Sequence, residues 1–390
     1  MENQKICPAD RLSDIKPYYF AGKLKEIAAL NAKGMDIISL GMGGPDMPPP
    51  SAAIEAAVAT LERPDTHSYQ PAMGLPALRK AFSEWYAKWY GVRGLDPDSQ
   101  ILPLAGSKEG ITFISMAFLN KGDGVLVPNP GYPAYSAASK LVEAEIFNYD
   151  LSEDNGWLPD FAALERMPLQ KIKLMWVNYP NMPTGTPADM GIFERLVAFG
   201  KKHDIVIVND NPYSFIMNDR PTSILQIPGA LDICMELNSL SKCLDMAGWR
   251  VGVLVGKPEF LGWVHRVKSN IDSGQPRFIM EGAIAALHSP AEWYRNLNET
   301  YCRRQKIGVE IMKALRCLVR LPQQGLFVWG RIPEDLPDSM EYSQIIQDKA
   351  RVFITPGFIF GKTGNRYLRI SLCCPEERLK ECLQRIQSCL

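Results

Sequence analysis

Three features are missing from this sequence, and each absence argues against a class of protein. No stretch approaches 18 uninterrupted apolar residues, so we expect no membrane-spanning helix. The first residues, MENQKICPADRLSD, are polar and lack the apolar centre of a signal peptide. Lys and Arg total 43, as do Asp and Glu, and this balance does not suggest a basic face for nucleic acid.

Cysteine is present, but not in a pattern that binds metal. The nine cysteines are an odd number and are scattered along the chain. The only close pair is Cys373 and Cys374, and adjacent cysteines rarely bind one ion together. We therefore expect no metal site and free thiols in the reducing cytoplasm.

The order of apolar and polar segments predicts an α/β fold. The chain has 390 residues, which suits a large domain with a smaller one. Helical patterns at Lys108–Leu119 and Met190–Lys202 lie between short apolar runs, and this alternation predicts a mostly parallel sheet. These runs are Ile101–Leu104, Gly124–Val127, Ile172–Val177, Ile205–Val208, Ile233–Leu237 and Val251–Val255.

The last third of the chain has a different pattern, with long helices and short strands. We predict a smaller α+β domain over residues 281–390, strands near 325–330 and 366–371, and a closing helix. The large domain is predicted to span residues 46–280. Residues 1–45 are predicted to form an N-terminal arm and part of the small domain.

Lys242 is the first candidate for chemistry, because it directly follows an apolar strand. Ligand sites in parallel sheets lie at strand ends, and a lysine in a partly dry pocket has a lowered pKa and forms imines with aldehydes. Ser239, Ser241 and Arg250 supply the hydroxyls and the cation that a phosphate needs. Taken alone, a lysine in such a polar turn is more often an ordinary surface residue.

Two other strand ends carry polar side chains. Ser107 and Lys108 open a helix after the strand at 101–104, where free N–H groups favour an anion such as phosphate. Asp210 ends another apolar strand, where a carboxylate is costly unless paired, and Tyr213 follows three residues later. Each feature alone is equally compatible with a simple turn, an Asp that caps it and a Tyr that packs.

The ordered set of motifs resembles the class I/II aminotransferase family of fold-type I pyridoxal-phosphate enzymes. The resemblance runs from about residue 20 to 388 and implies an aspartate aminotransferase-like fold, with a seven-stranded type of sheet in the large cofactor domain. It rests on several short motifs in a fixed order: Leu40-Gly-Met-Gly-Gly-Pro-Asp46, Tyr69 with Gly74 and Leu78-Arg79, Gly106-Ser-Lys, Asn181-Met-Pro-Thr-Gly, Asp210-x-x-Tyr213, Ser239-x-x-Lys242, Arg250 and Tyr367-Leu-Arg369-Ile-Ser.

The resemblance implies a role for each matching position. Lys242 corresponds to the lysine that forms the Schiff base with pyridoxal 5'-phosphate and carries the proton. Asp210 corresponds to the partner of the pyridine nitrogen, which strengthens the ring as an electron sink. The other positions match the donor to the ring oxygen (Tyr213), the phosphate cradle (Ser107, Lys108, Ser239, Arg250), the ring-stacking aromatic (Tyr132), the tyrosine that reaches the neighbouring subunit (Tyr69) and the α-carboxylate site (Gly43, Arg369).

One position departs from the family pattern. The family has Asn immediately before Pro-Thr-Gly, bonded to the ring oxygen, and this chain has Met182, whose thioether cannot donate a hydrogen bond. Either Asn181 or Asn178 substitutes, or Tyr213 is the only donor; of these we expect Asn181. Loss of one donor would raise the pKa of the imine.

The expected activity is therefore a transaminase (EC 2.6.1 type) that moves an amino group from an L-amino acid to a 2-oxo acid, as a cytoplasmic homodimer. A carbon–sulfur β-lyase and an aminocyclopropanecarboxylate-synthase-like enzyme share most of these motifs. The turn at Asn181 favours the branch with LL-diaminopimelate, aspartate, methionine and aromatic aminotransferases, without choosing among them.

Two alternatives from other classes are weaker. A non-catalytic pyridoxal-phosphate-sensing domain would normally accompany a DNA-binding domain, and about 20 residues precede the enzyme-like region, which is too few for a winged helix. A nicotinamide dehydrogenase is disfavoured because Gly41-x-Gly43 lacks the full glycine spacing and the acidic residue about 20 positions later.

Overall fold

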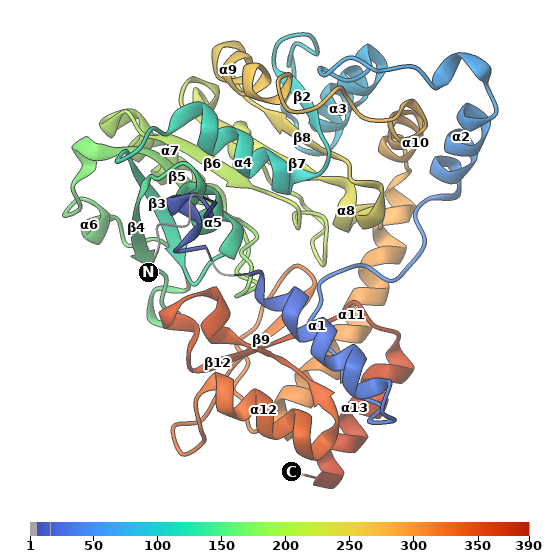
Figure 1. Cartoon of the computed structure of the whole chain (residues 1–390), viewed down its shortest axis with the longest axis vertical. Coiled ribbons are helices and arrows are strands. Elements are labelled where there is room, and N and C mark those ends of the chain that lie inside the picture. The colour runs from blue at the N-terminus through green and yellow to red at the C-terminus, as the bar shows by residue number, and fades with distance from the viewer. Residues whose placement is uncertain (1–5, 16, 390) are drawn as a thin grey trace.

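A seven-stranded sheet forms the centre of the larger part of the protein (Figure 1). The structure is a computed structural model and describes residues 6–15 and 17–389. Neighbouring strands are parallel except β8, which runs antiparallel to both β2 and β7. In sheet order, the strands are β2 (Ile101–Leu104), β8 (Gly252–Val255), β7 (Cys234–Ser239), β6 (Val206–Asp210), β5 (Ile172–Val177), β3 (Gly124–Asn129) and β4 (Glu145–Asp150).

Helices cover both faces of this sheet, which explains why most of its strands are buried along their whole length. One face packs on α4 (Ser107–Phe118), α5 (Pro133–Leu141) and α9 (Pro258–Lys268). The other packs on α3 (Pro76–Trp89), α7 (Met190–His203) and α10 (Arg277–Leu287), and α2 (Ser51–Leu61) lies against α10. The mostly parallel α/β fold predicted from the sequence is therefore confirmed.

The sequence prediction missed β4, for a physical reason. This strand lies at the sheet edge and pairs only with β3. Its sequence, EIFNYD, has one buried residue, Tyr149, so it lacks the apolar run that marks a strand buried on both faces.

The smaller part of the protein combines segments from both ends of the chain. Near the N-terminus, β1 (Ile38–Ser39) pairs in parallel with β10 (Val352–Phe353), and α1 (Tyr19–Asn31) precedes it. A three-stranded antiparallel sheet has the order β11 (Thr355–Pro356), β12 (Tyr367–Ser371), β9 (Phe327–Arg331). The remaining helices here are α11 (Ala291–Ala314), α12 (Ser339–Ala350) and α13 (Glu376–Cys389).

These segments meet the sheet domain along one side, where the cavity described below lies (Figure 1). The predicted arm over residues 1–45 includes residues 1–5, which lie outside the described residues. In the described part of the chain, no helix is both long and apolar enough to span a bilayer.

Candidate active site

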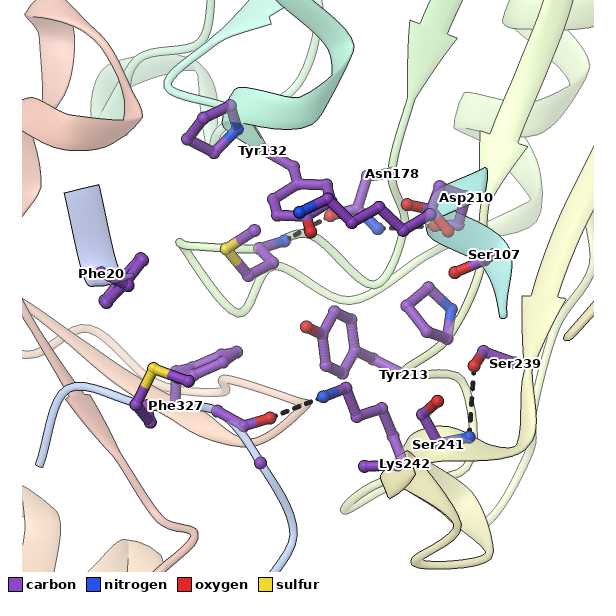
Figure 2. A pocket seen from close by; sticks show the side chains of 18 of the residues that line it. Phe20, Ser107, Tyr132, Asn178, Asp210, Tyr213, Ser239, Ser241, Lys242 and Phe327 are labelled. Carbon is purple, nitrogen blue, oxygen red and sulfur yellow. Dashed lines mark hydrogen bonds between the residues drawn. The ribbon is translucent and has the colours of Figure 1, made fainter. Parts of the chain in front are cut away.

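The strand ends of the large sheet open into a cavity of about 440 Å³ (Figure 2). Residues from α1, the loop after β1 and the three-stranded sheet close its other side. All of the predicted site residues except Asn181 and Tyr69 line this cavity. They come from positions as far apart in the chain as Gly43 and Arg369. The fold therefore brings into one cavity motifs that are widely separated in the sequence.

Lys242 projects into the cavity from α8 (Leu240–Cys243), a single turn that follows β7 directly. The hydroxyl of Ser239 starts this turn by accepting from the backbone N–H of Ser241 at 3.2 Å. The Nζ of Lys242 donates to the backbone oxygen of Gly43 at 2.6 Å, across the cavity. Burial lowers the pKa of Lys242, which favours the uncharged amine that a nucleophile or base requires.

Asp210 lies at the end of β6, and its carboxylate is only half satisfied. Its Oδ2 accepts from the hydroxyl of Tyr135 at 2.8 Å, whereas its Oδ1 is buried without any hydrogen-bond partner. Burial raises the pKa of Asp210 to about 6, against the lowering effects of Tyr135 and Lys242. A buried oxygen of this kind can bind a cationic N–H of a ligand, which would lower the pKa again.

Tyr135 is a site residue that the sequence analysis missed. It belongs to α5 and is fully buried, and its ring stacks on Trp176 with centroids 5.1 Å apart and planes 6° apart. Its hydroxyl therefore has little freedom except to donate to Asp210. The available signal was its position three residues after Tyr132, on the same side of the helix that begins at Pro133.

One end of the cavity is suited to an anion. Ser107 and Lys108 begin α4, whose first N–H groups are free of helix partners. Arg250 has a left-handed backbone (φ 58°) and extends to this end, where its guanidinium donates to the backbone oxygen of Ala105 at 3.2 Å. A side chain at Gly106 (φ 87°) would collide with that guanidinium, so glycine is required there.

Lys108 also reaches the mouth of the cavity. Its ammonium lies 4.5 Å from the centroid of the Tyr18 ring, in a cation–π contact with the segment that precedes α1.

Arg369 extends from β12 into an aromatic setting. Its guanidinium lies 3.9 Å from the ring centroid of Phe327, 4.7 Å from that of Phe360 and 5.5 Å from that of Phe20. One amino group donates to the backbone oxygen of Gly41 at 2.8 Å, and the Nε is buried without a partner. Burial lowers the pKa of Arg369 to about 10, so the side chain remains cationic at neutral pH and retains a free N–H for a carboxylate.

The turn after β5 corrects one prediction. Asn181 does not line the cavity, because its amide donates to the backbone oxygen of Asn178 and its oxygen accepts from Thr184. Asn178 does line it, but its amide nitrogen donates to the backbone oxygen of Asp210 and its oxygen accepts from the N–H of Met182. The structure therefore places Asn181 outside the cavity, unlike the position that the prediction gave it.

Met182 takes the place of the expected asparagine in the cavity wall, with its sulfur 3.3 Å from a guanidinium nitrogen of Arg369. Tyr213 faces the cavity, and burial raises the pKa of its hydroxyl, which keeps the hydroxyl protonated as a donor. Tyr132 lines the cavity above it (Figure 2). Tyr69 lies elsewhere and is 91% exposed, so its role toward a second subunit stays a prediction.

These residues fit pyridoxal phosphate on three independent grounds. The anion end suits a phosphate, the unpaired Oδ1 of Asp210 suits a protonated pyridine nitrogen, and Lys242 supplies an amine for an aldehyde. The described residues include no cluster of His, Cys, Asp and Glu that could hold a metal ion. All nine cysteines are free thiols.

Comparisons with known proteins agree with this geometry. The family described as "Aminotransferase class I and II" matches residues 35–386. A protein of Dehalococcoides mccartyi named LL-diaminopimelate aminotransferase is 40% identical over 378 residues, which are 96% of this chain and 97% of that protein. A protein of the same name from Aquifex aeolicus is 38% identical, over 97% of this chain and 98% of its own.

Solved structures extend the comparison to the fold. Substrate-bound BacF from Bacillus subtilis superposes with a TM-score of 0.93 at 33% identity and 98% coverage of both chains. A probable N-succinyldiaminopimelate aminotransferase from Thermus thermophilus gives 0.88 at 33% identity, covering 95% of this chain and all of that one. A Thermus thermophilus aspartate aminotransferase variant shares the fold, with a TM-score of 0.90 at 24% identity over 99% of this chain and 100% of that one.

Proposed function

Because this chain belongs to the class I and II aminotransferase family, we propose that the cavity around Lys242 is its active site and that the side chains described above carry out the transfer. The chain is a pyridoxal-phosphate-dependent aminotransferase, an enzyme of the transaminase class. Its reaction moves an amino group from an amino acid to a 2-oxo acid.

In this proposal Lys242 holds the cofactor covalently, and the phosphate is held at the anion end by Ser107, Lys108, Ser239, Ser241 and Arg250. Asp210 would pair with the ring nitrogen through Oδ1, Tyr213 would donate to the ring oxygen and Tyr132 would stack on the ring. The bound cofactor supplies an electron sink that stabilises negative charge at the α-carbon of the substrate.

The substrate is positioned by Arg369, whose free Nε–H faces the α-carboxylate, with Gly43 beside it. With the cofactor bound, the Nζ of Lys242 would be the base that takes the proton from the α-carbon of the substrate. The lowered pKa of Lys242 suits this task, because a base must be uncharged near neutral pH. The unpaired Oδ1 of Asp210 opposite Lys242 is the observation that carries the proposal.

Lys242→Ala tests this assignment directly. The variant should bind the cofactor only by non-covalent contacts, so borohydride should no longer fix the cofactor to the protein. Turnover should fall by more than about 10³-fold. Lys257→Ala, at a surface lysine paired with Glu259, is the matched control and should retain both properties. Full activity of the Lys242 variant would rule out the assignment.

A β-lyase on the same scaffold would behave differently in solution. It would release pyruvate and ammonia from cystathionine without an added 2-oxo acid. A transaminase requires the 2-oxo acid for each turnover, so the two activities separate in one assay.

The same proposal covers the assembly. We expect a cytoplasmic homodimer in which the exposed Tyr69 reaches the phosphate of the neighbouring site, with domain boundaries near residues 45 and 280. Tyr69→Phe should weaken cofactor binding in the dimer; unchanged cofactor affinity would remove Tyr69 from the site. The named relatives make LL-diaminopimelate one candidate amino donor.

A further inference from the structure

We propose that this cavity accepts an amino donor with a large, apolar and uncharged side chain, such as that of phenylalanine or methionine, in preference to a donor with a second ammonium group. The inference rests on the proposed function, because it places the α-carboxylate at Arg369 and the reacting amine at Lys242. The remaining walls of the cavity then contact the rest of the substrate.

The first argument concerns charge. Among the described residues that line the cavity, Asp210 is the only carboxylate. It lies at the ring end, where Tyr135 occupies one oxygen and the proposed cofactor nitrogen occupies the other. The Lys and Arg side chains of the lining, Lys108, Lys242, Arg250 and Arg369, are all basic. A second ammonium on the donor would therefore lose its hydration without gaining a counter-charge from this chain.

The second argument concerns the surface next to Arg369. The rings of Phe20 and Phe360 lie within 5.5 Å of the guanidinium, so a carboxylate that docks there brings the substrate against them. Met42 lines the rim of the same space and is 42% exposed. Phe20 at the start of α1, Met42 in the loop after β1 and Phe360 in the turn before β12 contribute three apolar side chains to this wall.

An apolar wall of this kind favours an apolar side chain by excluding water from it. The gain per methylene is modest, and the larger discrimination comes from the uncompensated charge of the wrong donor. The cavity thus differs in expected preference from the substrate named for its 40% identical relatives.

The test measures the half-reaction of the holoenzyme. A donor is added without a 2-oxo acid, and the change in visible absorbance reports the reaction. The second-order rate constants for phenylalanine and methionine should be at least about 10²-fold higher than those for LL-diaminopimelate or lysine. Equal or faster reaction with LL-diaminopimelate would overturn the inference and leave the transaminase assignment intact. Failure of every donor, with no covalently held cofactor, would instead reject the proposed function.

A charge-introducing variant gives a second readout. Met42→Glu places a carboxylate on the apolar wall, and the ratio of phenylalanine to lysine reactivity should fall by about 10-fold or more. Met340→Glu adds the same charge at an exposed methionine on α12, away from the cavity, and should leave the ratio unchanged. An unchanged ratio in the Met42 variant would show that this wall does not face the substrate side chain.

Discussion

Two buried carboxylates lie on neighbouring strands of the same sheet and have opposite surroundings. Glu236, on β7, is fully buried and accepts four hydrogen bonds: from Tyr86 and Ser223 on Oε1, and from Asn209 and the backbone N–H of Ile224 on Oε2. Asp210, at the end of β6, accepts one side-chain bond and keeps an oxygen without a partner.

We propose that this difference separates a structural carboxylate, Glu236, from a functional one, Asp210. Burial raises the pKa of both groups, to about 7 for Glu236 and about 6 for Asp210, so pKa alone does not distinguish them. The number of hydrogen-bond partners does distinguish them, because a carboxylate whose oxygens are all hydrogen-bonded has no free acceptor for a ligand. An unsatisfied buried oxygen that faces a cavity is the better sign of a binding role.

The largest expected effect comes from Asp210→Asn. Loss of the charge opposite the ring nitrogen should lower kcat by about 10²- to 10³-fold, because a preorganised charge at the reacting group is removed. Covalent attachment of the cofactor at Lys242 should persist. Glu236→Gln should keep kcat within a few-fold, and a large loss of kcat there would show that partner count does not separate the two roles.

For the free energy of unfolding, the order of the two sites should be reversed, with the larger loss at Glu236. Glu236→Ala leaves four buried donors without an acceptor, and the free energy of unfolding should fall by about 3 kcal/mol or more. In the cofactor-free protein, Asp210→Asn should be no less stable than the wild type at pH 7.5, because it removes a poorly compensated buried charge. Urea unfolding of the cofactor-free proteins measures both. Equal destabilisation by the two variants would contradict the comparison.

The pH dependence of stability should depend on the cofactor at only one of the two sites. The folded state holds the Asp210 proton more tightly than the unfolded state, so stability falls as pH rises from the ordinary value of 3.8 to about 6. Relative to Asp210→Asn, this fall should reach at most about 3 kcal/mol in the cofactor-free protein.

Bound cofactor should abolish the Asp210 contribution, because its ring cation favours the carboxylate. The similar fall from Glu236, through pH 4.5 to about 7, should persist with the cofactor bound. Unfolding at a series of pH values, with and without cofactor, distinguishes the two; a persistent Asp210 contribution would argue against pairing with the ring nitrogen.

A smaller effect is expected from Tyr135→Phe. The hydrogen bond to Asp210 lowers the pKa of that carboxylate, so its loss should reduce kcat by about 10-fold and move the acid limb of the pH–rate profile upward. Tyr342→Phe is a matched control, because Tyr342 is also buried and donates to the backbone oxygen of Leu315, away from the cavity. An unmoved pH profile would limit Tyr135 to packing.

The smallest expected effect is at Met182. Met182→Asn would restore a donor near the ring oxygen, and the pH at which the visible chromophore of the holoenzyme titrates should fall by about one unit. Met182→Leu, which adds no donor, should leave that titration within a few tenths of a unit. No difference between the two variants would show that Tyr213 alone sets the chromophore.

Sequence patterns predicted much of this protein where the physical signal was local. Continuous apolar runs marked β2 and β8 because those strands are buried along their whole length, and Lys242 was found because it follows β7. The polar edge strand β4 was missed because half of it faces solvent. Tyr135 was missed because a buried tyrosine looks the same in sequence whether it packs or donates.

Asn181 shows most clearly what the sequence patterns did not predict. Its amide is the right group next to the right motif, and it was expected in the cavity. The turn directs it inward, where its amide donates to the backbone oxygen of Asn178 and its oxygen accepts from the backbone N–H of Thr184, because the buried backbone of that loop needs those bonds. Side-chain direction in an irregular turn depends on the closure of the whole loop, which short motifs do not determine.

The sequence by itself determined which chemical groups are available to this protein: an amine after one strand, a carboxylate after another, an anion-binding turn and an arginine near the C-terminus. Local periodicity and motif order were sufficient for that. Only the tertiary structure decided which of these groups are satisfied and which are free. The unpaired oxygen of Asp210 and the aromatic surroundings of Arg369 arise from contacts between segments that are distant in the chain.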